Sequence, residues 1–150
     1  MKTQVHWRDG ASFVGETESG HAIVMDGPAD FGGKNLGPRP MEMLLLGLGG
    51  CTAFDVVMML QKSRQNILDC IVVIDAERAD SEPKVYTKIH IHFQVYGTGL
   101  SEKQVTRAVE LSATKYCSAS IMLGKTAEVT HDFEIIEGSE TKTGMTLPGR

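Results

Sequence analysis

Residues 40–60 read PMEMLLLGLGGCTAFDVVMML, and the only charges in this run are Glu42 and Asp55. Pro40 suits the first turn of a helix, and Glu42 complements the positive end of the helix dipole. The run is apolar on every face, so we expect a helix over Met41–Leu60 that is buried all round. Its uncharged part is shorter than the roughly 20 residues that cross a membrane. Since one chain of 150 residues has little material to surround such a helix, a second subunit is expected to cover it.

Short strands are predicted before this helix. Asp9-Gly10 and Ser19-Gly20 are turn signals between apolar segments, which is typical of an antiparallel meander. Glycines and prolines then interrupt residues 26–39, so we expect one long loop there. The three strand segments are Gln4–Arg8, Ser12–Glu16 and His21–Met25.

The region after the helix is predicted to contain strands and further helices. The clearest strand is Val85–Tyr96, where apolar odd positions alternate with polar even positions, so that one face lies on a core. Ser101 is a good helix N-cap. The order of elements predicts an α+β fold. The other expected elements are a strand over Cys70–Arg78, helices after Ser101 and over Ser120–Leu123, and a last strand over Ala127–Ile135.

Composition limits the class of protein. The chain has 150 residues, 41% of them hydrophobic, which favours a single domain, assigned to residues 1–137, with residues 138–150 as a mobile tail. The net charge of −4 without a basic block disfavours nucleic-acid binding. The N-terminus lacks the apolar region of a secretory signal, and three cysteines make no disulfide scaffold. We therefore expect a cytoplasmic protein that binds neither nucleic acid nor a membrane.

Two cysteines could carry chemistry. Cys51 lies near the middle of the expected buried helix, and Cys117 lies at or near the start of a helical stretch. A thiol at a helix N-terminus is activated because the dipole stabilises its thiolate. A buried thiol without such help behaves as a small inert hydrophobe. Spacing alone favours a packing role for Cys51 and Cys117. It favours that role more strongly for the third cysteine, Cys70.

His90 and His92 share one face of a predicted strand and are candidate metal ligands. Histidines at positions i and i+2 can chelate a divalent ion. Because no other ligands follow at a recognisable spacing, solvated or partner-facing histidines are favoured. No bound metal or organic cofactor is expected.

Two motifs resemble the OsmC/Ohr family, the osmotically induced and organic hydroperoxide resistance proteins. Residues 40–53 resemble its Pro-x-Glu-x-Leu-Leu…Gly-Cys helix, and Lys115-Tyr116-Cys117-Ser118 resembles its second cysteine motif. The spacing between the two cysteines and the element order β(3)-α-β(2)-α(2)-β also agree, over about residues 3–137. The YhfA-like branch is suggested by Trp7 with Asp9-Gly10, Gly20-His21, Asp26-Gly27, and Leu60-Gln61-Lys62 with Arg64-Gln65.

The resemblance implies an intertwined, swapped homodimer with buried central helices and active sites at the subunit interface. It also implies a thiol-dependent peroxidase that reduces organic hydroperoxides in oxidative-stress defence. Cys51 would form a sulfenic acid, Cys117 would resolve it to a disulfide, and an external dithiol would reduce both. Glu42 and Arg39 are the candidates for the glutamate and arginine that hold the first cysteine in the family, with Arg8 as the other arginine candidate.

The alternative is a non-catalytic dimer that binds a small molecule or senses redox state. It is favoured by Met41, which stands where the family's glutamate follows the motif proline, and by the lack of an arginine clearly at the family's position. On an ideal helix Glu42 lies about 13.5 Å from Cys51 and about 180° round the axis. Glu42 can therefore serve only Cys51 of a second subunit, unless it merely complements the helix dipole.

Overall fold

The computed structural model describes residues 1–138. It divides into two compact units, whose boundary between Gly47 and Leu48 lies inside one helix. Apart from Gly138, the expected mobile tail over residues 138–150 lies outside the described residues. The assignment of residues 1–137 to one domain stays a prediction.

The N-terminal unit is built on the predicted meander. Its strands are β1 (Thr3–Asp9), β2 (Ser12–Thr17) and β3 (Ala22–Asp26), and they pair antiparallel in the order β1-β2-β3. The turn between β1 and β2 uses Gly10 at φ 49°, a left-handed conformation that glycine adopts without steric cost. A short 3₁₀ helix, η1 (Ala29–Phe31), interrupts the expected loop.

A buried carboxylate organises this loop. Asp26 is buried and accepts backbone N–H bonds from Gly27 at 2.9 Å, Lys34 at 2.9 Å and Leu36 at 3.0 Å. These bonds, led by the one from Leu36, hold the pKa of Asp26 below its ordinary value. Position 37 must be glycine, because a Cβ there would lie 2.2 Å from the Val24 carbonyl oxygen. The loop is therefore fixed by hydrogen bonds and close backbone contact rather than by an apolar core.

Helix α1 (Pro40–Lys62) confirms the predicted central helix and is slightly longer than expected. It ends where Arg64 takes a left-handed φ of 57°. One stripe of the helix is buried, and the opposite stripe is exposed in the single chain, with Phe54 65% exposed. The buried stripe consists of Leu48, Thr52, Val56 and Leu60, and the exposed stripe of Leu46, Gly50, Phe54 and Met58.

By length and composition α1 is the one helix of residues 1–138 that could cross a membrane. The core helix of a globular protein meets the same two criteria. One stripe of α1 is buried against the core of this chain and consists of Leu48, Thr52, Val56 and Leu60.

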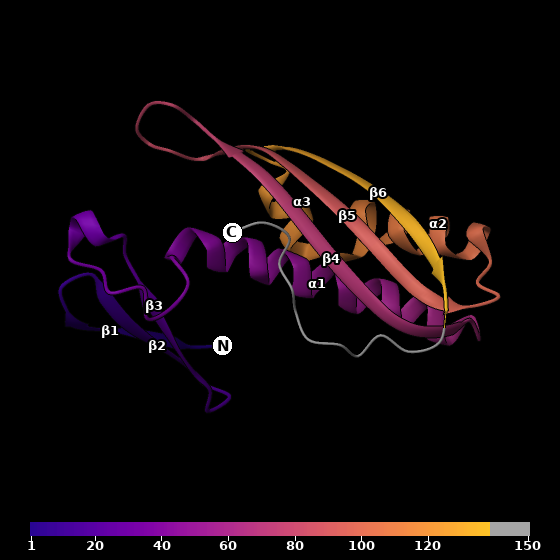
Figure 1. Ribbon diagram of the computed structural model, residues 1–150, viewed down its shortest axis with the longest axis horizontal. Helices are drawn as coiled ribbons and strands as arrows, with labels where there is room; N and C mark the ends of the chain where they lie inside the picture. The colour runs from indigo at the N-terminus through magenta and orange to yellow at the C-terminus, as the bar shows by residue number, and fades with distance from the viewer. Residues whose placement is uncertain (139–150) are drawn as a thin grey trace. The chain divides into compact units, whose positions relative to one another are not determined.

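The C-terminal unit is a three-stranded sheet with helices on one face (Figure 1). Strands β4 (Asn66–Arg78) and β5 (Tyr86–Thr98) pair antiparallel, and β6 (Glu128–Glu137) pairs parallel to β5. The crossover from β5 to β6 contains α2 (Glu102–Leu111), the π-helical turn η2 (Ser112–Tyr116) and α3 (Ser118–Leu123). The α+β class and the expected order of elements are confirmed.

The alternation predicted in β5 forms the core of this unit. Ile89, Ile91, Phe93 and Val95 are at most 1% exposed, and the buried stripe of α1 and the inner face of α2 complete the core. The even positions, including His90 and His92, lie on the other face. Strand β4 begins at Asn66, four residues before the predicted Cys70. The sheet and its helices thus hold α1 and η2 beside each other, which positions the candidate site.

Candidate dithiol site

Cys117 owes its position to an irregular turn. The regular helix α2 ends at Leu111, and the backbone N–H of Cys117 donates to the Ser112 carbonyl at 2.9 Å across five residues. This π-helical bond is rare and frequently marks a functional site. Cys117 is also the N-cap of α3, and its Sγ accepts the backbone N–H of Ser120 at 3.4 Å. The prediction that Cys117 lies at the start of a helical stretch is confirmed.

The structure brings Cys51 and Cys117 together, although 66 positions separate them in the sequence. Cys51 lies on α1 between the buried and exposed stripes and is half-buried, whereas Cys117 is 0% exposed. The two thiols are close enough for Cys51 to raise the pKa of Cys117, and both are free. A solute from the surrounding water can therefore reach the sulfur of Cys51 before that of Cys117.

The environment keeps Cys117 protonated. Burial raises the pKa of the Cys117 thiol most, and the neighbouring Cys51 and the negative charge of Asp55 raise it further, to about 11. The backbone N–H of Ser120 acts in the opposite direction, since it stabilises a thiolate. The Cys117 sulfur therefore keeps its proton at neutral pH.

The structure places three polar side chains beside the dithiol. Ser112 and Thr52 are buried, with their hydroxyl oxygens 2.9 Å apart, and the Ser112 hydroxyl donates to Asp55 at 3.1 Å. Asp55 follows Cys51 by one turn of α1. No short motif joins residues that lie 57 to 60 positions apart. No local pattern marks Ser112, because both of its side-chain partners lie on α1.

Asp55 also lines a cavity of about 500 Å³ whose walls come from α1, α2 and η2. Met58, Leu111 and Tyr116 supply apolar wall, and Arg107 supplies a positive charge. An opening of this composition can admit an apolar solute with a polar end. It lies next to the dithiol because Asp55 belongs to both.

Arg39 and Glu42 belong to the N-terminal unit, whereas both cysteines belong to the C-terminal unit. The Glu42 carboxylate accepts the backbone N–H of Arg39 at 2.8 Å, and the Arg39 carbonyl accepts the N–H of Met43 at 3.1 Å. This is half of a capping box, in which the third helical residue satisfies the N-cap amide. Within one chain Glu42 therefore caps α1. The Arg39 guanidinium makes no ion pair with any residue of the described range 1–138.

Cys70 stands apart from this site. It lies on β4 opposite Val95, and burial together with the neighbouring Asp69 raises the pKa of its thiol to about 12. Such a thiol is not ionised at neutral pH and is a poor nucleophile. These surroundings agree with packing.

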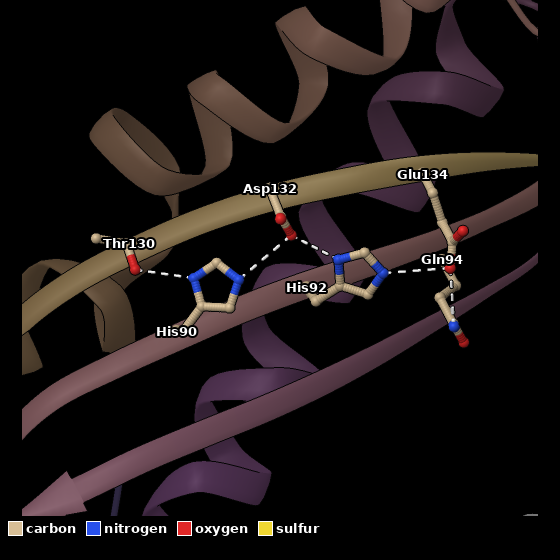
Figure 2. A network of polar contacts seen from close by, with 6 residues as sticks. All are labelled: His90, His92, Gln94, Thr130, Asp132 and Glu134. Carbon is tan, nitrogen blue, oxygen red and sulfur yellow. Dashed lines mark hydrogen bonds and ion pairs between the residues drawn. The ribbon is translucent and has the colours of Figure 1, made fainter. Parts of the chain in front are cut away.

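The two histidines considered as metal ligands take part in a hydrogen-bond network across β5 and β6 (Figure 2). His92 bonds Asp132 through Nδ1 and Glu134 through Nε2 at 3.2 Å. His90 bonds Thr130 at 2.9 Å and lies 3.4 Å from Asp132. The carboxylates, Asp132 first, raise the pKa of His92 above its ordinary value. The imidazoles are thus held by their own sheet rather than left to solvent.

Among residues 1–138 no group of three or more His, Cys, Asp or Glu side chains is placed to hold a metal ion. A ring nitrogen that donates to a carboxylate has no lone pair to give to a metal. The expectation that the protein binds no metal or cofactor stays a prediction.

Comparison with known proteins identifies the family. The profile described as OsmC-like protein matches residues 32–132. The chain is 47% identical over 136 residues to Protein YhfA of Escherichia coli strain K12, which covers 91% of this chain and 98% of the relative.

Solved structures agree with this match. A hypothetical protein from Aquifex aeolicus VF5 superimposes with a TM-score of 0.80 at 28% identity, covering 92% of this chain and 97% of that one. The organic hydroperoxide resistance protein OhrB of Bacillus subtilis shares the fold with a TM-score of 0.61 at 15% identity, covering 89% and 98%. The extent of the family match and the identity to a relative of nearly full length establish that the chain belongs to the OsmC-like protein family.

Proposed function

We propose that this protein is a thiol-dependent peroxidase that reduces organic hydroperoxides, with Cys51 as the attacking cysteine and Cys117 as the resolving cysteine. The observation that carries the proposal is the proximity of these two free thiols, one half-buried and one buried. Membership of the OsmC-like family supports it. So do the names of structural neighbours such as OhrB, an organic hydroperoxide resistance protein.

The proposed reaction has three balanced steps. The Cys51 thiolate attacks the terminal oxygen of ROOH, which breaks the O–O bond and, with one proton, gives ROH and a sulfenic acid on Cys51. The Cys117 sulfur then attacks the Cys51 sulfur, and the released hydroxide leaves as water with the Cys117 proton. An external dithiol reduces the resulting disulfide and is itself oxidised. The protein supplies both reacting sulfurs and needs no bound metal or organic cofactor.

The burial of the two sulfurs suits this division of roles. The attacking sulfur must meet a peroxide from solution, and Cys51 is the more exposed of the two. The resolving sulfur must stay protonated and protected from over-oxidation until the sulfenic acid forms, and the raised pKa of Cys117 meets that need. Apolar walls of the neighbouring cavity favour organic hydroperoxides over hydrogen peroxide.

The proposal includes a cytoplasmic homodimer. In the single chain the stripe Leu46, Gly50, Phe54 and Met58 of α1 is uncovered, and added Cβ atoms at Gly47 and Gly50 would meet nothing within 4 Å. A second copy of the helix fits such an open, small-residue surface. In this dimer Glu42 or Arg39 of one chain would serve Cys51 of the other, because Glu42 cannot reach across its own helix.

The test is stopped-flow consumption of cumene hydroperoxide with dithiothreitol as reductant. We expect Cys51→Ser to abolish turnover and Cys117→Ser to leave a sulfenic acid that a sulfenic-acid-specific reagent traps. The matched control is Cys70→Ser, which removes a third thiol outside the site and is expected to leave the rate unchanged. Turnover that survives Cys51→Ser would refute the proposal.

The second candidate is a non-catalytic dimer that binds a small molecule or senses redox state. It is favoured by the role of Glu42 as a cap of its own helix, together with an Arg39 that makes no ion pair within residues 1–138. A sensor needs the dithiol but not rapid turnover. Reversible disulfide formation with negligible peroxide consumption by the unaltered protein would establish this second function in place of the first.

A further inference from the structure

A buried chain of hydrogen bonds links α1 to the turn that carries Cys117. The Ser112 hydroxyl has one proton, and the strongest acceptor within reach is the Asp55 carboxylate at 3.1 Å. The Thr52 hydroxyl, 2.9 Å from the Ser112 oxygen, then donates to Ser112. The order of donation is Thr52 to Ser112 to Asp55, and each buried hydroxyl is satisfied. This series of hydrogen bonds ends at the negatively charged carboxylate of Asp55.

Ser112 transmits this anchoring to Cys117. It is the first residue of η2, and its carbonyl oxygen accepts the backbone N–H of Cys117 at 2.9 Å. Its side chain is thus fixed to α1 while its main chain fixes the resolving cysteine. An i to i+5 turn is seldom stable on its own. A hydroxyl bound to a buried partner on another helix is a specific reason for this turn to persist here.

The charge of Asp55 acts on the same cysteine. It lies close enough to oppose ionisation of the Cys117 thiol, in addition to burial and the Cys51 sulfur. The titratable groups acting on Cys117 are thus Cys51 and Asp55, both on α1. Removing the Asp55 charge would therefore let Cys117 ionise at lower pH.

We propose that Asp55 is a positioning residue of the dithiol: by accepting the Ser112 hydroxyl it holds the turn that presents Cys117 to Cys51. The consequence for peroxide turnover rests on the proposed function. The geometry of disulfide closure does not depend on the proposed function, because any disulfide-forming oxidant can test it.

Two variants separate the roles of Asp55. Asp55→Asn removes the charge but keeps an oxygen that accepts from Ser112. Ser112→Ala removes the hydroxyl but keeps the charge. Both are made in a Cys70→Ala background, so that only Cys51 and Cys117 titrate or react. The matched control is Asp69→Asn, which neutralises a carboxylate beside position 70 rather than beside the dithiol.

The first measurement is the thiolate absorbance of the reduced protein as a function of pH. Asp55→Asn is expected to move the Cys117 titration to lower pH, whereas Asp69→Asn leaves it in place. The second is disulfide closure after oxidised glutathione has formed a mixed disulfide on Cys51. In that step the Cys117 sulfur attacks the Cys51 sulfur and releases reduced glutathione. Ser112→Ala is expected to slow closure about ten- to a hundredfold, the effect of a small misplacement of a reacting group.

The proposal is overturned if Asp55→Asn leaves the titration of Cys117 unchanged, or if Ser112→Ala closes as fast as the parent. If Ser112→Ala does not fold, the nearly isosteric Asp55→Asn still decides whether the charge acts. None of these readouts uses a peroxide. A protein that shows both effects but consumes no cumene hydroperoxide would refute the peroxidase proposal and leave this inference standing.

Discussion

The two units of this protein are stabilised by different means. The C-terminal unit encloses an apolar core of side chains such as Leu48, Phe93 and Val109, each at most 1% exposed. Among residues 1–47, all of which the structure describes, only the polar Ser12 and Asp26 are buried. Large apolar side chains of that unit, including Trp7 and Phe31, are 67% and 76% exposed.

This difference indicates what each unit needs. The burial of apolar side chains stabilises the C-terminal unit within its own chain. The N-terminal unit keeps its shape by strand pairing and by the amide bonds to Asp26, and its apolar side chains need cover from another surface. The exposed stripe of α1 is apolar as well and also needs cover from another surface. The following variants test this comparison, in order of decreasing expected effect.

The largest effect is expected from Phe93→Ala. The ring fills the centre of the C-terminal core, so its removal leaves a cavity and should lower the free energy of unfolding by about 3–5 kcal/mol. The matched variant in the other unit is Phe31→Ala, which should cost far less. Urea denaturation at one protein concentration measures both. Equal losses would contradict the contrast between the units.

Phe54→Glu is expected to break the proposed dimer. A carboxylate in the middle of the exposed stripe of α1 would be buried without a partner, which costs about 3 kcal/mol or more and weakens association about a hundredfold. Sedimentation velocity across a range of concentrations measures the change. Ser81→Glu, in the exposed loop between β4 and β5, adds the same charge and should have no effect. A stable monomer of the unaltered protein at micromolar concentration would end the dimer proposal.

Asp26→Asn is expected to loosen the N-terminal unit alone. The amide side chain can accept fewer of the three backbone N–H groups, so Lys34 and Leu36 should lose protection from hydrogen exchange while the C-terminal strands keep theirs. Asp30→Asn, an exposed neighbour in η1, is the control. If protection is lost in both units together, the units are not independently stabilised.

The same carboxylate makes the N-terminal unit sensitive to acid. The pKa of Asp26 is lower in the folded protein than its ordinary value of 3.8. Its contribution to stability is therefore present above pH 3.8 and is lost as the pH falls through the folded value. Hydrogen exchange followed to low pH should show the loop over residues 26–39 opening before the apolar core of the other unit.

Much of the fold could be predicted because its signals are local. The Asp9-Gly10 turn and the alternation in β5 each depend on residues a few positions apart, and both are confirmed. The first four residues of β4 were missed because Asn66 and Asp69 interrupt the apolar pattern, and the pairing with β5 shifts register there. A shifted register has no periodic signature in the sequence.

The candidate site was less predictable, for the same reason. The resemblance singled out Cys51 and Cys117, but spacing alone favoured packing for both. The chain from Thr52 through Ser112 to Asp55 depends on helix packing and on a turn with i to i+5 bonding, neither of which has a sequence period. For Glu42 the sequence left two roles open, and the capping of α1 is the one seen within a single chain.

The smallest expected effect concerns the His92 network on the exposed face of the C-terminal sheet. The folded pKa of His92 is raised above 6.5, so its contribution to stability is complete below pH 6.5 and is lost as the pH rises through the folded value. Asp132 and Glu134 have lowered pKa values, so their contribution is present above their ordinary values of 3.8 and 4.5 and is lost in acid. The network is therefore strongest between about pH 4.5 and pH 6.5.

His92→Gln should remove this pH dependence, with a loss of at most about 1 kcal/mol because the ion pairs are accessible to solvent. Asp75 lies opposite His90, and the Lys88–Glu77 pair lies further along the same face, so those charges remain in the variant. Urea midpoints measured across the window for the unaltered protein, for His92→Gln and for His6→Gln test the idea. His6 is an exposed histidine of β1 in the other unit, and its variant should keep the pH dependence. If the two histidine variants behave alike, the carboxylates of β6 do not form stabilising ion pairs with His92 in solution. The outer face of the C-terminal sheet then contributes as little to stability as the exposed strands of the N-terminal unit.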